Sequence, residues 1–192
     1  MSHLTSDYWT NRYEVGKTGW DLKNISPPLK SYIDQLEDKN LRILIPGAGY
    51  GYEVVYLFNK GFKHLYYLDF SPAPLKYFKK MLPDFPQEQL FCEDFFQHSA
   101  VYDLILEQTL FCAIDIELRA DYAKKVHDLL VPGGKVVGLL FNRQFDSGPP
   151  FGGSKEEYMN RFAPYFSRLE MDECYNSIEA RSGTELFICL TK

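Results

Sequence analysis

Residues 41–51 decide the fold of this chain, and they read Leu-Arg-Ile-Leu-Ile-Pro-Gly-Ala-Gly-Tyr-Gly. The apolar run at 41–45 ends at a Pro-Gly step, which is typical of a short buried strand. The glycines behind it carry no Cβ atom, so the backbone can turn tightly and approach a ligand closely. Residues 52–59 are expected to continue as a helix whose first N–H groups lack backbone partners. The stretch therefore predicts a strand, a ligand-binding turn and a helix.

Strands and helices alternate on the carboxyl side of this unit. Apolar runs predict further strands at 65–68, 89–92, 102–106 and 135–141. Apolar residues at helical spacing predict helices at 72–82 and 117–131. A turn at Pro132-Gly133-Gly134 is expected before the last of these strands. Such alternation indicates a parallel sheet with helices on both faces.

The two ends of the chain depart from this alternation. After residue 153, a helix is followed by two strands joined by a hairpin-like turn around Gly183, with expected ranges of 154–166, 168–175 and 184–191. Before residue 41, short helices are expected at 6–15 and 29–38. The fold class is therefore α/β, with a mostly parallel seven-stranded sheet that ends in a C-terminal antiparallel hairpin.

Composition narrows the kind of partner. The 192 residues carry a formal net charge of -5 and no basic stripe, whereas nucleic-acid binders need one to neutralise phosphates. None of the four cysteines lies in a Cys-x-x-Cys spacing, so neither a metal site nor a redox pair is expected. No apolar run approaches the length of a membrane span, and the first seven residues contain no signal region. We expect a cytoplasmic protein, a monomer or weak dimer, whose partner is a small molecule.

Acidic residues follow two of the strands in the order that a nucleoside ligand requires. Asp69 closes the second strand, where its carboxylate can accept both hydroxyls of a ribose, unless it only caps the next helix. Asp94 and Phe95 leave the third strand and can bind an adenine amino group and pack on its ring, although Phe95 can equally be a core residue. The dinucleotide fingerprint needs Gly or Ala where Tyr52 stands, which argues against a nicotinamide-dependent oxidoreductase.

With these motifs in this order, the chain resembles class I S-adenosylmethionine-dependent methyltransferases. More narrowly, it resembles the thiopurine S-methyltransferase superfamily, closest to its thiol and halide methyltransferases. Residues 44–49, Leu-Ile-Pro-Gly-Ala-Gly, look like that family's Leu-Val-Pro-Gly-Cys-Gly. Residues 111–114, followed by Glu117 and Arg119, match its Phe-Cys-Ala-Ile-x-x-Glu-x-Arg stretch.

The resemblance extends to both flanks of this core. Residues 148–151, Gly-Pro-Pro-Phe, resemble the family's Gly-Gly-Pro-Pro-Tyr, and the family's N-terminal Trp-x3-Trp-x6-Trp-Asp segment corresponds to Trp9-x3-Tyr13-x6-Trp20-Asp21. Two positions depart from the family. Tyr13 stands where a Trp is usual, and Gln108 stands where the plant branch has a Tyr. The acceptor pocket is therefore expected to differ in shape and polarity.

The resemblance implies a Rossmann-like class I methyltransferase fold, with S-adenosylmethionine as the cofactor and S-adenosylhomocysteine as the product. It divides a single domain, residues 1–192, into an N-terminal helical lid at 1–38 and a Rossmann-like core at 39–192. The lid aromatics would face the sulfonium and exclude water. The implied cofactor contacts are Trp9, Tyr13, Trp20, Gly47, Gly49, Asp69, Asp94, Phe95 and Gln108.

The expected reaction is methyl transfer to a small soft nucleophile: a thiol, hydrosulfide, thiocyanate, halide or thiopurine. No histidine or lysine is placed as a base, which an alcohol acceptor would need and a thiolate or halide would not. Arg119 could hold an acceptor's negative charge, or could be a solvated residue at a helix start. The alternatives are a small-molecule O- or N-methyltransferase, a macromolecular methyltransferase, and a non-catalytic protein that binds S-adenosyl ligands.

Overall fold

The computed structural model describes residues 4–192, so the first three residues of the predicted lid lie outside the described part. Seven strands form one sheet: β1 (Arg42–Pro46), β2 (His64–Asp69), β3 (Leu90–Cys92), β4 (Tyr102–Gln108), β5 (Leu130–Phe141), β6 (Arg168–Glu173) and β7 (Glu185–Thr191). Their order in the sheet is β3-β2-β1-β4-β5-β7-β6. The strands β1 to β5 run parallel, whereas β7 is antiparallel to both of its neighbours. The predicted α/β class and its mostly parallel sheet are confirmed.

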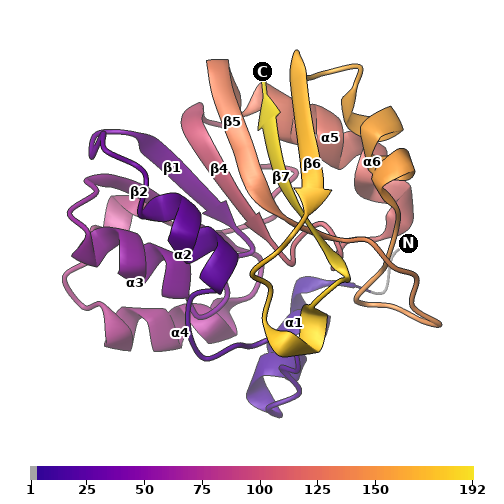
Figure 1. Cartoon of the computed structure of the whole chain (residues 1–192). Coiled ribbons are helices and arrows are strands. Elements are labelled where there is room, and N and C mark those ends of the chain that lie inside the picture. The colour runs from indigo at the N-terminus through magenta and orange to yellow at the C-terminus, as the bar shows by residue number, and fades with distance from the viewer. Residues whose placement is uncertain (1–3) are drawn as a thin grey trace.

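The α-helices of the described chain are α1 (Ser6–Glu14), α2 (Pro27–Ile33), α3 (Tyr52–Asn59), α4 (Pro72–Met81), α5 (Arg119–Asp128) and α6 (Lys155–Phe162). Figure 1 shows helices on both faces of the sheet: α2, α3 and α4 lie on one side, and α5 and α6 on the other. The helix α1 lies below the carboxyl ends of the parallel strands, where it contacts α4. Within residues 4–192, no helix is both long and apolar enough to cross a membrane.

The alternating side chains of β1 supply two hydrophobic cores. Ile43 and Ile45 pack in the core under α2, α3 and α4, whereas Leu44 packs in the core under α5 and α6. None of the three is more than 3% exposed. Burying a side chain of this size contributes roughly 1.5–3 kcal/mol. The strand is thus held from both faces, and it gives the turn that follows a rigid base.

The turn after β1 is held by two close approaches. Gly51 has a φ of +77°, and a Cβ atom there would lie 2.3 Å from the Phe78 ring of α4. The Tyr67 hydroxyl of β2 donates to the Gly49 carbonyl oxygen at 2.7 Å. A side chain at position 51 would therefore push α4 away from the turn. The predicted sequence of strand, turn and helix over residues 41–59 is confirmed.

The segment Pro132-Gly133-Gly134 is not a turn before the last parallel strand, as the sequence suggested, but a bulge inside β5. Pairing with β4 skips from Leu130 to Lys135, so the intervening residues have no partner on β4. Gly133 has a left-handed φ of +77°, which glycine adopts without steric strain, so the bulge can form here. The helix predicted at 117–131 is correspondingly shorter, because Leu130 already belongs to the strand.

The C-terminal antiparallel pair is not a tight hairpin. The strands β6 and β7 are joined by residues 174–184, which contain a 3-10 turn at Glu179–Arg181.

Near the N-terminus, the helix predicted at 29–38 is α2, which begins earlier because Pro27 occupies the first helical position. The connection at 174–184 comes close to the N-terminal segment, and this approach matters for the site.

Candidate active site

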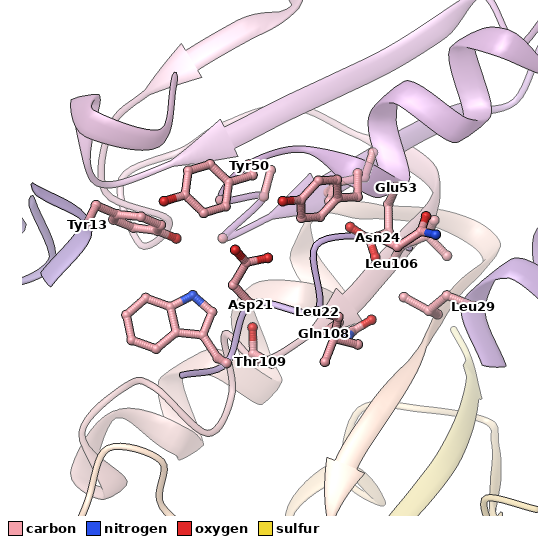
Figure 2. Close-up of a pocket in the computed structure, with 16 residues that line it drawn as sticks. Tyr13, Asp21, Leu22, Asn24, Leu29, Tyr50, Glu53, Leu106, Gln108 and Thr109 are labelled. Carbon is pink, nitrogen blue, oxygen red and sulfur yellow. The ribbon is translucent and has the colours of Figure 1, made fainter. Parts of the chain in front are cut away.

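Two neighbouring cavities open at the carboxyl ends of the parallel strands, where open α/β sheets bind ligands. The larger measures about 740 Å³ and is lined by the N-terminal segment, the turns after β1 to β5 and the 174–184 connection. The smaller measures about 70 Å³ and is drawn in Figure 2. Both cavities are lined by Tyr13, Trp20, Leu22, Gly47 and Thr109, so they share a wall.

Asp69, at the end of β2, lines the larger cavity and is only 7% exposed. Its Oδ2 accepts from the Gly49 N–H at 2.8 Å, and its Oδ1 accepts from the Ser71 N–H at 2.8 Å. Burial raises the pKa of Asp69 to about 6, although these backbone donors oppose the shift. A carboxylate has about four lone-pair directions, so each oxygen can still accept one hydroxyl. The geometry fits the two adjacent hydroxyls of a ribose.

The turn after β3 brings Asp94 and Phe95 to the same cavity. The Asp94 Oδ1 accepts from the Phe96 N–H at 2.9 Å, which fixes the turn. Phe95 is 5% exposed, and its ring centroid lies 5.2 Å from that of Tyr122. Phe95 is therefore a core residue, as one of the two sequence expectations had it, and it also lines the cavity.

A buried histidine supports this turn. His98 is 2% exposed, and its two ring nitrogens lie 2.6 Å from the Glu93 Oε1 and 2.6 Å from the Tyr102 hydroxyl. Glu93 also lines the cavity, so the histidine ties its wall to β4. This link could not be predicted from the sequence, because the three residues belong to no common spacing pattern.

Three aromatic side chains of the N-terminal segment cover the larger cavity. Trp9 and Tyr13 lie on α1, and the ring centroid of each lies 5.5 Å from that of Trp20. The helix is fastened beside α4 by the Thr10 and Ser71 hydroxyls, which lie 2.8 Å apart. The structure therefore brings together the aromatic residues that the sequence singled out.

Gly49 and Gln108 line the smaller cavity rather than the larger one. The Tyr13 hydroxyl lies so close to Gly49 that a Cβ atom there would be 2.9 Å from it. The Gln108 Oε1 accepts from the Ser26 hydroxyl at 2.6 Å, which ties the start of α2 to the end of β4. Figure 2 shows the carboxylate of Asp21 in the middle of this group, between Tyr50 and Thr109. This cavity combines exposed backbone with carboxylate and amide groups.

Arg119 does not line either cavity. It is 1% exposed, and its guanidinium donates to the carbonyl oxygens of Phe151 and Gly152 and to the carboxylate of Glu157. This placement contradicts the expectation that Arg119 holds an acceptor's charge, and also the opposite expectation of a solvated residue. The physical reason is that a buried guanidinium needs fixed acceptors, and the neighbouring loop supplies them.

The cations that do line the larger cavity are Arg12, Arg143 and Arg181. Arg181 donates to the Glu185 carboxylate at 3.3 Å and to the Trp20 carbonyl oxygen at 3.1 Å. Sequence reasoning missed these arginines, because they come from three separate segments: Arg12 lies on α1, whereas Arg143 and Arg181 lie in the connections after β5 and before β7. The second bond also joins the 174–184 connection to the N-terminal segment.

The guanidinium carbon of Arg143 lies 4.7 Å from the Phe145 ring centroid, and that of Arg181 lies 5.6 Å from the Phe141 ring centroid. Further apolar residues that line the cavity include Cys112, Ile114, Leu118, Pro149, Pro150, Ile178 and Ala180. Burial and the neighbouring Glu107 raise the pKa of the Cys112 thiol to about 12. That thiol is protonated at neutral pH, so Cys112 does not act as a catalytic nucleophile.

In the sheet, β5 and β7 stand on the opposite side of β1 from β2 and β3. The arginines and apolar residues are therefore separated from Asp69 and Asp94.

Comparison with known proteins gives this site a family context. The family model described as "Thiopurine S-methyltransferase (TPMT)" matches residues 4–185. "Probable thiol methyltransferase 2" of Arabidopsis thaliana is 31% identical over 192 residues, which cover 96% of this chain and 84% of that protein. "Thiocyanate methyltransferase 1" of Brassica oleracea is 30% identical over 184 residues, covering 92% and 81%. "Thiopurine S-methyltransferase" of Vibrio vulnificus is 25% identical over 187 residues, covering 87% and 86%.

Solved structures share the fold at lower sequence identity. The Burkholderia thailandensis 1,6-didemethyltoxoflavin-N1-methyltransferase, solved with its bound substrate and S-adenosylhomocysteine, superposes with a TM-score of 0.71 and 15% identity, covering 97% of this chain and 86% of that one. The magnesium protoporphyrin IX methyltransferase of Synechocystis, also solved with S-adenosylhomocysteine, gives a TM-score of 0.65 and 12% identity, covering 85% and 81%. At these identities the likeness concerns the fold alone.

Proposed function

Because this chain belongs to the thiopurine S-methyltransferase family of S-adenosylmethionine-dependent methyltransferases, we propose that its acceptor is a small soft nucleophile. The class comprises thiols, hydrosulfide, thiocyanate, halides and thiopurines. The observation that carries the proposal is the division of the larger cavity, which has Asp69 and Asp94 toward one side and apolar walls with Arg143 and Arg181 toward the other. An aromatic, apolar compartment removes water from a large polarizable anion more easily than from a compact one.

The cofactor would occupy the acidic side of the larger cavity and extend into the smaller one. In this proposal Asp69 accepts the ribose hydroxyls, Asp94 accepts from the adenine amino group, and Phe95 packs on the ring. Gly47 and Gly49 let the backbone approach the ligand closely, since they carry no side chain. The amino-acid end would fill the smaller cavity, where Asp21 and Gln108 offer oxygen acceptors to its ammonium group.

Bound S-adenosylmethionine supplies an activated methyl group on a sulfonium, which a nucleophile can take directly. The chain's own residues then orient the acceptor and exclude water. Trp9, Tyr13 and Trp20 present aromatic faces to the positive charge, and each face stabilises a cation by roughly 0.5–2 kcal/mol. Arg143 and Arg181 would attract an anionic acceptor into the apolar compartment. A thiolate or halide brings its own electron pair, so this arrangement requires no protein base.

Methylation assays with labelled S-adenosylmethionine and matched panels of thiols, halides, phenols and amines test this proposal. We expect turnover of thiols and soft anions, with the rate on each thiol rising with pH until that thiol is ionised. Turnover confined to phenols or amines would contradict the acceptor class. Tight binding of S-adenosylhomocysteine with no turnover of any panel would instead indicate a protein that only binds S-adenosyl ligands.

A further inference from the structure

Arg119 has a set of partners that the proposed chemistry leaves unexplained. It begins α5, and its Nη1 donates to the Gly152 carbonyl oxygen at 2.9 Å and to the Glu157 Oε1 at 3.1 Å. Its Nη2 donates to the Phe151 carbonyl oxygen at 3.0 Å. Two of these acceptors are backbone atoms of the segment between β5 and α6. A single side chain therefore holds this segment from within the core.

That segment, residues 142–154, forms part of the cavity wall, and we name it the acceptor loop. Its residues Arg143, Phe145, Pro149 and Pro150 line the larger cavity. On its inner side, the Phe151 N–H donates to the Cys112 carbonyl oxygen at 2.7 Å. The loop thus rests against residues 109–118, which line the same cavity from the end of β4.

We propose that Arg119 is a positioning residue, whose guanidinium locks the acceptor loop against residues 109–118 and so fixes the width of the acceptor compartment. The inference rests on the proposed function for the identity of that compartment. The Arg119 guanidinium carbon also lies 4.6 Å from the centroid of the Phe111 ring, which belongs to residues 109–118. Phe111 is itself held by its N–H, which donates to the buried Glu107 carboxylate at 3.0 Å. Both walls are therefore tied to the same guanidinium.

The planar fork of arginine is what allows these bonds to form together. Its terminal nitrogens point in fixed directions, whereas a lysine places one compact ammonium at the end of a flexible chain. Arg119→Lys keeps the positive charge but cannot reach Phe151, Gly152 and Glu157 with the same geometry. The variant therefore removes the hydrogen bonds to the acceptor loop while it keeps the positive charge.

Arg161 offers a matched control. Its Nη2 donates to the same Glu157 Oε1 at 3.1 Å, but it makes no bond to the acceptor loop. Arg161→Lys thus perturbs the same carboxylate and leaves the carbonyl contacts of Arg119 in place. Glu157→Gln provides a milder second variant, because it removes the charge partner while the two carbonyl contacts remain.

Hydrogen exchange and steady-state kinetics on the full chain test the inference. In Arg119→Lys we expect amide exchange in residues 142–154 to become at least tenfold faster, while exchange in the rest of the sheet is unchanged. The KM for the acceptor should rise about tenfold or more, because small misplacements of a bound reactant are costly. The Kd for S-adenosylhomocysteine should stay within about twofold of the wild type. Arg161→Lys should change none of these quantities, and Glu157→Gln should fall between the two.

Two results would overturn the inference. One is unchanged exchange and unchanged acceptor KM in Arg119→Lys. The other is faster exchange throughout the core, with the cofactor Kd rising in step with the acceptor KM, since that would mark a general contribution to stability. The exchange measurement needs no acceptor. It therefore decides whether the lock exists even if the wild-type protein methylates no soft nucleophile and the proposed function fails.

Discussion

At the scale of single residues, Asp69 has a structural task, and we propose a ligand-binding task beside it. Its two oxygens accept the N–H groups of Gly49 and Ser71, which holds the glycine turn to the start of α4. Asp69 also lines the larger cavity, and a carboxylate has more lone pairs than these bonds use. Because the protein has already oriented this carboxylate, a ligand does not have to restrict its motion on binding.

We expect Asp69→Ala to weaken binding of S-adenosylhomocysteine by roughly 1–3 kcal/mol, because ligand hydroxyls would lose their partners. Titration calorimetry measures this directly. The wild-type affinity should also fall as the pH drops below about 6, where Asp69 becomes protonated. Asp69→Asn keeps the shape and should remove this pH dependence. Equal affinity in wild type and Asp69→Ala would place the ribose elsewhere.

Gly49→Ala tests how closely the N-terminal segment approaches the turn. The added Cβ would lie 2.9 Å from the Tyr13 hydroxyl, at a φ of +55°. We expect a loss of stability of roughly 1–2 kcal/mol from the left-handed backbone, together with weaker cofactor binding. Gly61→Ala is the control, because its φ is +83° and nothing lies within 4 Å of the added atom. A thermal and binding profile identical to that of Gly61→Ala would show that Tyr13 does not matter.

Single residues were predictable where chemistry and chain order agree. Asp69, Asp94 and Phe95 each follow a strand, so parallel topology was enough to bring them to one edge of the sheet. Their contacts with the cofactor stay a prediction. Arg119 and Arg181 could not be placed from the sequence. Beside one carboxylate each, they donate to backbone oxygens in irregular loops, and such loops have no periodic pattern.

At the scale of elements, the segment from α1 to Trp20 is tied to the start of α4 by Ser6 and Thr10, which bond the Phe70 carbonyl oxygen and the Ser71 hydroxyl. No residue of α1 is fully buried. Gly16 and Gly19 follow it with open space around their Cα atoms. Arg181 holds the far end through the Trp20 carbonyl oxygen. Few contacts and small residues allow a segment to open locally at low cost in free energy.

We expect residues 1–25, of which the structure describes 4–25, to act as a lid that the cofactor orders. The chain contains only two tryptophans, and both lie in this segment, so tryptophan fluorescence, excited where the 14 tyrosines do not absorb, reports on the lid alone. Adding S-adenosylhomocysteine should shift the emission and slow proteolytic cleavage near Gly16 and Gly19. Trp9→Phe assigns the remaining signal to Trp20. Cleavage at the same rate with and without ligand would show that the segment is a fixed part of the fold.

Element types were predictable because the apolar runs match the parallel strands and the helical spacing matches α4 and α5. The residues at which helices and strands begin and end were less predictable. The bulge in β5 contains Pro and Gly, which single-sequence reasoning reads as a turn. Only the pairing of Lys135 beside Leu104 reveals that the strand continues through it.

At the scale of the whole molecule, three carboxyl groups link stability to pH. Burial raises the pKa of Asp69 to about 6 and the pKa values of Glu53 and Glu107 to about 7. In the unfolded chain all three groups ionise near pH ~4. Between these values the ligand-free folded protein binds more protons than the unfolded chain. Its free energy of unfolding therefore falls as the pH rises through this window.

We expect the free energy of unfolding of the ligand-free protein to fall by on the order of 4–6 kcal/mol between pH ~5 and ~7.5, as measured by urea unfolding. Glu107→Gln should flatten this slope by roughly a third, because Glu53 and Asp69 still titrate in the variant. The amide oxygen can still accept the Phe111 N–H, and the amide nitrogen can donate to the Tyr122 hydroxyl.

The cofactor product should change the same slope for a different reason. A ribose bound to Asp69 favours its ionised form, so the stabilisation by S-adenosylhomocysteine should grow as the pH rises from ~5 to ~7. Glu107→Gln should leave this ligand-dependent part intact, whereas Asp69→Asn should remove it. If Asp69→Asn and wild type instead gain equally from the ligand at every pH, then the ribose does not meet Asp69. The same buried charge would then serve only to hold the turn after β1 to the start of α4.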